Sequence, residues 1–421
     1  MPTVYFETFG CQMNVADSDK IRSLLSVRGY TPADHPDEAD LIVVNTCSVR
    51  EKAETRALGR LRELCNRNRK EKKGQTIWVC GCMAQRLGDT LHELVPGLCA
   101  IIGAQKIDTV EEEIERLLPG CAPAPDALFP ESCAVSSFVP VMRGCDNFCA
   151  YCIVPYVRGR EHSFPAATLE EEVRRLTGQG TVEVTLLGQN VNSYNDNGID
   201  FPALLQRLHA VEGLRRIRFT TSHPKDCSER LIQTVAGLPK CCNHIHLPVQ
   251  AGSSRVLSAM NRGYTRKEYL HLIDRIRAHI PDADITTDVM VGFPGETPDD
   301  FSDTLSLFEQ VRYTDAFMFA YSPREGTAAA QIPDTVEPAE KKRRLQQIIE
   351  LQTGITRERY EHAVGDTVAV LAENKKNEQW IGRTDGCKRV AFPCETAIAG
   401  TIFKVRIQRS SGKTLIGEVS T

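Results

Sequence analysis

Three cysteines close together give this sequence its clearest chemical signal. Cys145, Cys149 and Cys152 stand at the spacing C-x3-C-x2-C, in a loop that follows an apolar run. Thiolates suit iron–sulfur clusters, and three of them hold three irons of a 4Fe–4S cube. The fourth iron then has no protein ligand and can chelate a small molecule. Three buried structural cysteines are the plainer interpretation, but the flanking Gly144 and Pro155 favour the cluster.

Three more cysteines lie far apart in the sequence but at equivalent positions. Cys11, Cys47 and Cys82 each come just past the carboxyl end of a predicted parallel strand. Ligand sites in open α/β sheets form at that edge, so the three thiols can converge on a second 4Fe–4S cluster with one free iron. Free cysteine is also a common core residue. Position alone therefore leaves both interpretations open, and Cys80 is a rival for Cys82.

The elements around these cysteines predict a doubly wound α/β domain over residues 1–118. Buried parallel-type strands alternate with helices of 3.6-residue periodicity. The predicted strands are 3–9, 40–45, 76–79 and 98–102, and the predicted helices are 17–27, 51–70 and 108–118. Residues 119–130 carry four prolines and no periodicity, which predicts a linker.

Residues 131–361 again alternate strands with amphipathic helices. The predicted strands are 137–142, 182–187, 216–221, 244–249, 284–291 and 314–320. Six β/α units with parallel strands and right-handed crossovers predict a partial TIM-type barrel, (β/α)6. Every strand but the last ends in polar or glycine-rich residues, which at the carboxyl end of a barrel indicates an active-site rim.

A different pattern begins at residue 362. Five short strands in some sixty residues, 364–371, 380–383, 388–392, 400–407 and 415–419, predict a small antiparallel β-barrel of the oligonucleotide-binding kind over residues 362–421. Nine Lys and Arg against six acidic residues give it a modest positive charge. Trp380 and Phe392 offer faces for base stacking, or fill the barrel core, which is the preferred interpretation for Phe392.

Composition limits the protein class. At 421 residues, with 41% hydrophobic and 25% charged residues, we expect a soluble globular protein of two or three domains. No apolar run reaches the ~20 residues that cross a bilayer, and the first residues lack a signal-peptide pattern, so we expect a cytoplasmic protein. Sixteen cysteines then indicate metal ligands rather than disulfides. The net charge of −4 restricts any nucleic-acid contact to a local patch.

The cysteine loop resembles that of the radical S-adenosylmethionine enzymes. Residues 7–14, 45–48 and 81–86 are similar to the N-terminal domain of the methylthiotransferases within that superfamily, and the C-terminal module resembles the RNA-binding TRAM domain. The resemblance covers the whole chain in order. It implies two 4Fe–4S clusters, one on Cys145, Cys149 and Cys152 and an auxiliary one on Cys11, Cys47 and Cys82. The family motif Gly-Cys-Met-Ala selects Cys82 over Cys80.

The resemblance also implies substrate and partners. Residues 9–14, 155–160 and 220–224 are most similar to the branch that acts on tRNA carrying N6-isopentenyladenosine at position 37. We expect S-adenosylmethionine to serve as radical source and methyl donor, with an electron donor, a sulfur source and a monomeric enzyme. The family's cofactor contacts fall on Tyr151, Gln189, Asn190, Ser222 and Gln250. Tyr151 packing beneath its loop is an equal alternative, and His223 is expected to shape its loop rather than to act as a base.

Three other functions stay open at this point. Methylthiotransferases acting on threonylcarbamoyladenosine in tRNA, or on a ribosomal protein aspartate, share the layout. A non-enzymatic RNA-binding iron–sulfur scaffold or electron carrier is a different class of protein, and the polar barrel rim and the three-cysteine sets argue against it.

Overall fold

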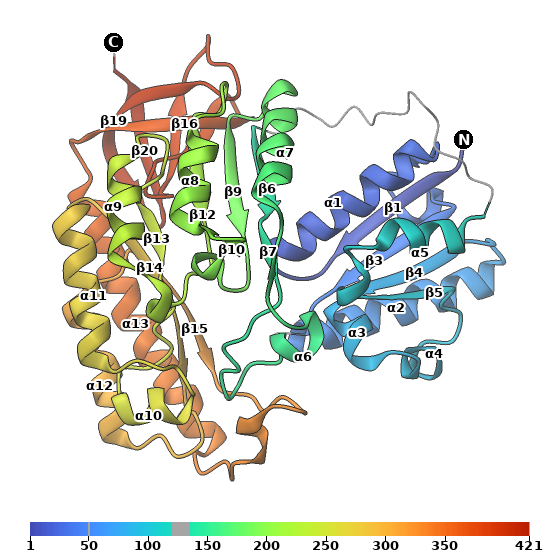
Figure 1. Cartoon of the computed structure of the whole chain (residues 1–421), viewed down its shortest axis with the longest axis horizontal. Coiled ribbons are helices and arrows are strands. Elements are labelled where there is room, and N and C mark those ends of the chain that lie inside the picture. The colour runs from blue at the N-terminus through green and yellow to red at the C-terminus, as the bar shows by residue number, and fades with distance from the viewer. Residues whose placement is uncertain (49–50, 120–134, 421) are drawn as a thin grey trace. The chain divides into compact units, whose positions relative to one another are not determined.

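The computed structural model describes residues 1–48, 51–119 and 135–420, and the chain packs as two units (Figure 1). The first unit holds Met1–Ser132 together with Arg143–Asp146 and Cys152–Glu161. The second unit holds Cys133–Met142, Asn147–Tyr151 and His162–Thr421. Most of the predicted linker, from residue 120 onward, lies outside the described residues.

The first unit is built on a five-stranded parallel sheet in the order β2-β1-β3-β4-β5. Its strands are β1 (Thr3–Thr8), β2 (Thr31–Pro32), β3 (Leu41–Thr46), β4 (Thr76–Gly81) and β5 (Ala100–Gly103). Its helices are α1 (Gln12–Val27), α2 (Glu51–Glu71), α3 (Cys82–Leu87), α4 (Thr90–Leu94), α5 (Val110–Leu117) and α6 (Val154–Arg158), with short 3-10 turns at Pro36–Glu38 and Ala104–Lys106.

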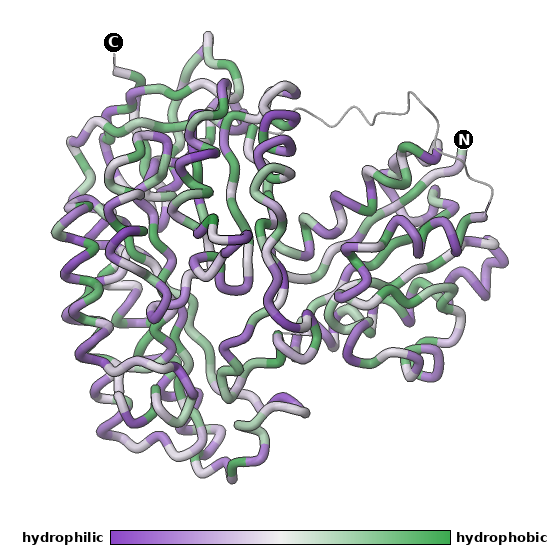
Figure 2. The backbone as a smooth tube through the Cα atoms, viewed as in Figure 1, coloured by the Kyte–Doolittle hydropathy of each residue, from purple (hydrophilic) through white to green (hydrophobic). Residues whose placement is uncertain are grey.

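Both faces of this sheet are covered, which explains its continuous apolar strands. Along β3, Ile42 and Val44 pack with Leu61 of α2, whereas Leu41 and Val43 pack with the cluster that includes α1 and α5. Figure 2 shows the apolar character of the central strands. A parallel sheet buried on both faces needs apolar residues at every position, and the predicted doubly wound α/β fold is confirmed.

Two local differences from the prediction have physical causes. Helix α1 begins at Gln12 rather than residue 17 because Cys11 caps it in a capping box with Asn14. Helix α3 was not predicted, since it starts directly from β4 with Gly81 at its N-cap and lasts only six residues.

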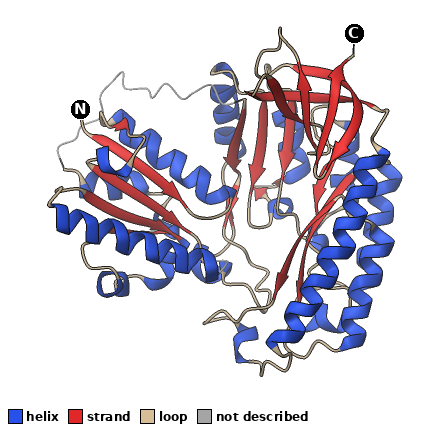
Figure 3. Ribbon diagram, turned by 180° about the vertical axis from the view of Figure 1, so that it is seen from behind, coloured by secondary structure: helices blue, strands red, loops and turns tan. Residues whose placement is uncertain are grey.

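The second unit contains six parallel strands in chain order (Figure 3). They are β6 (Ser136–Pro140), β9 (Glu183–Leu187), β12 (Arg216–Phe219), β13 (His244–His246), β14 (Asp284–Val291) and β15 (Asp315–Ala320). Strands β6, β9 and β12 form one sheet and β13, β14 and β15 another. A parallel bridge between Ile217 and Cys241 joins the two sheets. The predicted partial (β/α)6 barrel is confirmed.

Helices pack on the outer face of this barrel. They are α7 (Ala166–Gly178), α8 (Phe201–His209), α9 (Glu229–Gly237), α11 (Arg266–His279) and α12 (Pro298–Val311). The short α10 (Ser254–Ala259) instead packs in a separate cluster with Phe293 and Tyr321. The remaining short elements are β7 (Met142–Arg143), β8 (His162–Ser163), β10 (Asn195–Asp196), β11 (Ile199–Asp200) and 3-10 turns at Val191–Ser193, Pro224–Asp226 and Ala328–Gln331. Val184 and Leu186 of β9 enter the core shared with these helices. Glu183 alternates with them and points to the inner face.

A long helix, α13 (Pro338–His362), leads to a closed barrel of five strands. They are β16 (Thr367–Lys376), β17 (Gln379–Arg383), β18 (Arg389–Pro393), β19 (Ile402–Ser411) and β20 (Thr414–Val419). Four pairings are antiparallel as predicted, whereas β18 and β20 run parallel. Trp380 and Phe392 are buried in its core, so the predicted stacking role of Trp380 is wrong. The Trp380 indole instead donates to the carbonyl oxygen of Cys394 at 3.1 Å.

The small barrel is fastened to the amino ends of the large barrel's strands. Arg216, at the start of β12, donates to the carbonyl oxygens of Arg383 (2.7 Å) and Ala369 (3.0 Å). Arg218 donates to those of Asp385 and Thr384, both at 2.7 Å, and pairs with the fully buried Glu183 at 2.8 Å. Arginine suits this contact because its planar guanidinium can donate to several acceptors at once.

We predict that Arg218→Met lowers the free energy of unfolding by about 3–5 kcal/mol, because the buried Glu183 loses its close partner at 2.8 Å and keeps only the more distant Arg383, at 3.9 Å, as a cation. Urea denaturation of the full-length chain measures this. Arg215→Met is the matched control: Arg215 is exposed in the same segment, and its substitution should change stability by about 0.5 kcal/mol or less. Equal midpoints for the two variants would contradict the prediction.

Candidate metal centres

The register of three neighbouring strands brings the first three predicted cysteines to one edge. Strand β3 lies between β1 and β4, with Thr8 opposite Asn45 and Thr46 opposite Gly81. Cys47 and Cys82 directly follow β3 and β4, and Cys11 follows β1 by three residues. The carboxyl ends of these strands therefore place all three cysteines at a single sheet edge, as predicted from the sequence.

Two buried asparagines connect the three loops. Asn14 Nδ2 donates to Asn45 Oδ1 at 2.8 Å and to the Thr46 carbonyl oxygen at 3.1 Å. Asn45 Nδ2 donates back to the Asn14 carbonyl oxygen at 2.8 Å. The Cys11 thiol donates to Asn14 Oδ1 at 3.3 Å. Both residues stand within the motifs carrying the cysteines, but their spatial pairing left no signal in the sequence.

Gly81 completes this arrangement. Its φ of 94° lies in the left-handed region, and a Cβ atom there would overlap Asn45 Oδ1 and the Thr46 carbonyl oxygen. Thr46 Oγ1 in turn donates to the Cys80 carbonyl oxygen at 2.6 Å. Only glycine lets the loop before Cys82 approach the neighbouring strand end this closely.

The thiols at this edge differ in their surroundings. Cys11 is exposed, whereas Cys47 and Cys82 are buried. Burial raises the pKa of the Cys82 thiol, while the nearby Arg158 guanidinium opposes this shift. Cys80 is fully buried among apolar side chains, including Trp78 and Ile102, and burial raises its pKa strongly. The positive charge near Cys82 favours a thiolate there, and the choice of Cys82 over Cys80 stays a prediction.

Across residues 1–48, 51–119 and 135–420, no three His, Cys, Asp or Glu side chains gather closely enough to hold a single metal ion. A four-iron cube makes a different demand, because each thiolate binds its own iron and the sulfurs stand further apart. The edge thus offers three cysteines on adjacent loops, with a soft donor set appropriate to iron and sulfur.

Backbone hydrogen bonds hold the second cysteine loop. Cys145 and Cys152 belong to the first unit and Cys149 to the second. In the first unit, the Cys145 amide donates to the Gly159 carbonyl oxygen at 3.2 Å. In the second unit, the Ala150 amide donates to the Met260 carbonyl oxygen at 2.9 Å, and Phe148 adopts a positive φ of 44°. Backbone contacts on both sides therefore shape the loop.

Arg262 is a charged neighbour of this loop that sequence analysis missed. Its side chain is buried, and Nη1 donates to the Cys149 Sγ at 3.2 Å. Nη2 donates to the Pro248 carbonyl oxygen at 2.9 Å, and Nε to the Tyr264 hydroxyl at 3.0 Å. Hydrogen bonds to a thiolate sulfur favour its charged form and tune the potential of a cluster that it holds.

The carboxyl ends of β9 and β12 carry several buried polar atoms without partners. Within the described chain, Gln189 Oε1, Asn190 Oδ1, Ser222 Oγ and His223 Nε2 make no hydrogen bond. Asn190 is oriented by donating its amide to Asp226 Oδ2 at 2.7 Å. Buried polar atoms in proteins are nearly always bonded. Their accumulation on one rim fits a polar ligand, and three of these residues were predicted as cofactor contacts.

Backbone strain marks the same rim. Thr221, just after β12, has φ 68°, and Gln250, after β13, has φ 70°. Non-glycine residues adopt this region at a cost of about 1–3 kcal/mol and cluster at ligand sites. Gln250 is held there by its backbone, which receives the Met290 amide at 2.8 Å and donates to the Asp288 carbonyl oxygen at 2.9 Å. The geometry fits its predicted place at the site.

Two residues with alternative predicted roles have packing roles in the structure. His223 Nδ1 accepts from the Lys225 amide at 3.3 Å, and burial together with the charge of Arg262 lowers its pKa to about 2. It is therefore neutral at physiological pH and shapes its loop, as expected. Tyr151 is partly buried against the cluster that contains Phe293 and Tyr321, so its packing beneath the loop is observed.

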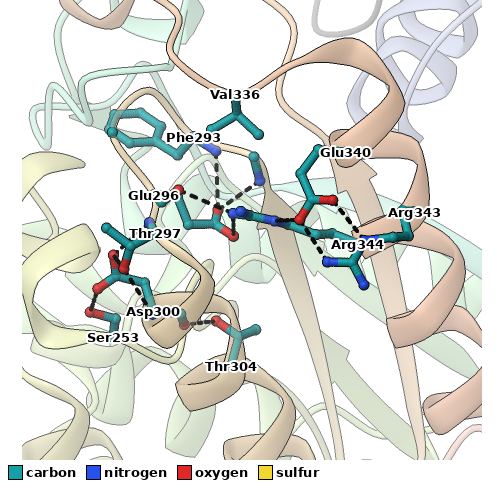
Figure 4. Close-up of polar contacts among 12 residues, drawn as sticks. Ser253, Phe293, Glu296, Thr297, Asp300, Thr304, Val336, Glu340, Arg343 and Arg344 are labelled. Atoms are coloured by element: carbon teal, nitrogen blue, oxygen red, sulfur yellow. Dashed lines mark hydrogen bonds and ion pairs between the residues drawn. The ribbon is translucent and has the colours of Figure 1, made fainter.

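The glycine-rich loop after β14 is held by a buried carboxylate (Figure 4). Glu296 accepts from the amides of Gly292 (2.6 Å) and Phe293 (3.1 Å) and pairs with Arg344 of α13 at 2.9 Å. Arg344 also pairs with Glu340 at 2.7 Å. This loop was predicted as part of the rim, but its fastening to α13 joins residues too distant in sequence to be predicted.

Comparison with known families agrees with this division of the chain. The Radical SAM superfamily model matches residues 139–308, the model described as uncharacterized protein family UPF0004 matches residues 3–103, and the TRAM domain model matches residues 363–420. The same stretches hold the second cysteine loop and its barrel, the first cysteine edge, and the small barrel.

Curated relatives match nearly the whole length. The tRNA-2-methylthio-N(6)-dimethylallyladenosine synthase of Geobacter sulfurreducens is 47% identical, covering 99% of this chain and 97% of the relative. The synthase of the same name from Geobacter metallireducens is 48% identical, with 99% and 98% covered, and that from Moorella thermoacetica is 43% identical, with 98% and 97% covered.

Among solved structures, the radical S-adenosylmethionine methyltransferase TsrM from Kitasatospora setae shares the fold, with a TM-score of 0.58 over 78% of this chain and 77% of that one at 15% identity. OxsB, a cobalamin-dependent S-adenosylmethionine radical enzyme, aligns with a TM-score of 0.50 over 84% of this chain and 56% of that one at 12% identity. At such identities the likeness concerns the fold alone.

We predict that Gly81→Ala loses most of the iron and sulfide bound at the first edge, because its Cβ would displace Asn45 and the loop bearing Cys82. After anaerobic reconstitution, iron analysis should give about half the parent value. Gly29→Ala is the control: Gly29 also has a positive φ, 82°, but open space for a Cβ. An unchanged iron content in Gly81→Ala would refute the proposed close approach.

Proposed function

Because this chain belongs to the family of the tRNA-2-methylthio-N(6)-dimethylallyladenosine synthases, we propose that it inserts a methylthio group at C2 of N6-isopentenyladenosine at position 37 of tRNA. The observation that carries the proposal is the pair of three-cysteine sites. One lies at the carboxyl edge of the first sheet, and the other lies in the loop after β6. A simple radical enzyme needs one such site, whereas sulfur insertion gives the second one a use.

The six cysteines divide the work in this proposal. Cys145, Cys149 and Cys152 hold one 4Fe–4S cluster, and Cys11, Cys47 and Cys82 hold the auxiliary one. When bound, the clusters and S-adenosylmethionine supply the electron transfer and the radical that removal of an inert aromatic hydrogen requires. Arg262 Nη1 donates to the Cys149 sulfur, and Asn14 Oδ1 accepts from the Cys11 backbone amide. These neighbours keep the sulfur donors in place so that positioning does not depend on the bound group alone.

The polar rim binds S-adenosylmethionine in this proposal. Its ribose hydroxyls, adenine and methionine groups offer the donors and acceptors that Gln189, Asn190 and Ser222 lack in the described structure. The neutral His223 adds a fourth unpaired atom beside them. Satisfying these atoms recovers a desolvation cost of about 1–3 kcal/mol each. Gln250 and Tyr151 remain predicted contacts, with S-adenosylmethionine serving as both methyl donor and radical source.

The C-terminal barrel, residues 362–421, contacts the RNA in this proposal. The side chains of Trp380 and Phe392 are buried in the barrel core, so RNA contact falls to other residues. Along β19, Lys404 and Arg406 are exposed while Val405 and Ile407 are buried, so the two cations share the outer face. Such a face suits phosphate contacts, which position RNA without reading its sequence. The other two proposed domains are residues 1–118 and 131–361. We propose that the enzyme is a monomer and depends on a cellular electron donor and a sulfur source.

We predict that Cys47→Ala abolishes the methylthio product but retains cleavage of S-adenosylmethionine to 5′-deoxyadenosine. The anaerobically reconstituted protein is incubated with S-adenosylmethionine, reductant and prenylated tRNA, and the digested tRNA is analysed by mass spectrometry. Cys99→Ala is the control, since Cys99 is exposed and lies away from the carboxyl edge of the sheet.

The wild-type protein decides the substrate. If it forms 5′-deoxyadenosine but no 2-methylthio nucleoside with this tRNA, the substrate assignment is refuted. Product with threonylcarbamoyladenosine tRNA or a ribosomal protein would then replace it. Product formation by Cys47→Ala equal to that of the wild type would instead refute the auxiliary site.

A further inference from the structure

A buried arginine lies beside the first cysteine edge, in a segment whose role the proposed chemistry leaves unexplained. Helix α6 follows Cys152 directly and packs within the first unit on α3, which begins with Cys82. Cys82, Ile153 and Val157 form one buried apolar cluster with Ala104. Arg158 ends α6 and is itself buried. Burying a charged arginine next to an apolar cluster costs free energy unless the charge is paired and hydrogen-bonded.

The guanidinium of Arg158 is oriented by a carboxylate on one side and faces sulfur on the other. Nη2 lies 3.1 Å from Oδ2 of the fully buried Asp17 on α1. The positive charge of Arg158 acts on the Cys82 and Cys11 thiols and opposes the rise that burial causes in the pKa of Cys82. Its buried Nη1 has no well-aligned acceptor among the described residues.

Asp17 is shared with a second buried arginine. Arg143 Nη1 lies 2.7 Å from Asp17 Oδ1, and its Nε lies 2.6 Å from Oδ1 of Asp108. Two carboxylates therefore balance two guanidinium groups. Arg158 is the member whose positive charge reaches the thiols, while Arg143 and Asp108 complete the support of Asp17.

Stability alone does not explain this group. Replacing buried ion pairs by apolar side chains of similar volume is often neutral or stabilising, so a buried pair is weak evidence for a structural role. A cluster held by three thiolates carries negative charge, and its potential depends on that charge and on hydrogen bonds to its sulfurs. A cation fixed beside Cys82 and Cys11 is suited to act on both.

We propose that Arg158 is a positioning residue of the first cysteine site: held by Asp17, its guanidinium hydrogen-bonds the Cys82 sulfur and offsets the negative charge of the cluster bound there. It raises the reduction potential of that cluster and slows its loss. Arginine rather than lysine is required, because only the planar fork reaches a carboxylate and a sulfur together. This inference rests on the proposed auxiliary cluster.

The test isolates that cluster in the full-length chain. With Cys145, Cys149 and Cys152 all changed to Ala, only the first edge can be loaded, and the parent should bind about four irons. Arg158→Gln is then introduced in this background, and the midpoint potential is measured by electron paramagnetic resonance during redox titration. Loss of the positive charge is expected to disfavour reduction at least tenfold, a downward shift of the midpoint potential of at least about 59 mV for one electron.

Two variants separate this role from a structural one. Arg158→Lys keeps the charge without the fork and should recover part of the shift. Arg160→Gln is the matched control, since Arg160 lies in the same segment, is largely exposed and pairs with Asp146; its potential should equal the parent value. Circular dichroism confirms that each chain is folded.

The possible results distinguish the role of Arg158 from the existence of the auxiliary site. A lower potential, or loss of the cluster from a folded Arg158→Gln chain, supports the proposal. Four bound irons with an unchanged midpoint overturns it and leaves the proposed function intact. If the parent with only the first edge available binds no cluster at all, the auxiliary site itself fails, and the inference fails with it.

Discussion

Parallel hydrogen bonding between β1, β3 and β4 determines where the first unit can hold a metal cluster. The register places Thr8, Asn45, Thr46 and Gly81 at one level, so the residues that follow must share an edge although they are separated by dozens of positions in the chain. Reciprocal hydrogen bonds between Asn14 and Asn45 then fix the loop that bears Cys11 against the end of β3. A one-residue slip of β4 would turn every side chain of that strand to the opposite face and remove the site.

The elements and cysteines were predictable because their signals are local. Apolar runs such as 40–45 identified the buried strands, and the cysteines follow those runs directly. The roles of Asn14, Arg158 and Arg262 were not predictable, since each depends on a partner distant in sequence. Trp380 shows the reverse failure: an aromatic residue in a basic module suggested stacking, but a barrel of five short strands needs large side chains to fill its interior.

The two ends of the large barrel differ in how their buried polar groups are bonded. At the amino ends of the strands, Arg216 and Arg218 donate hydrogen bonds to carbonyl oxygens of the small barrel. At the carboxyl ends, Gln189, Ser222 and others are buried without partners in the described part of the chain. A ligand that satisfies them binds only the folded form and therefore also stabilises the rim.

The position at which the small barrel is attached limits which ligands can contact both it and the rim. It lies at the amino ends of the strands, whereas the rim lies at their carboxyl ends, and the eight-residue β14 alone separates these ends by about 26 Å. One RNA that contacts both, as proposed, must span at least this distance. A free nucleoside or short oligonucleotide reaches one end only and forgoes the gain in effective concentration that two linked contacts provide. The proposed RNA contact on the small barrel and the rim therefore lie at opposite ends of the large barrel's strands.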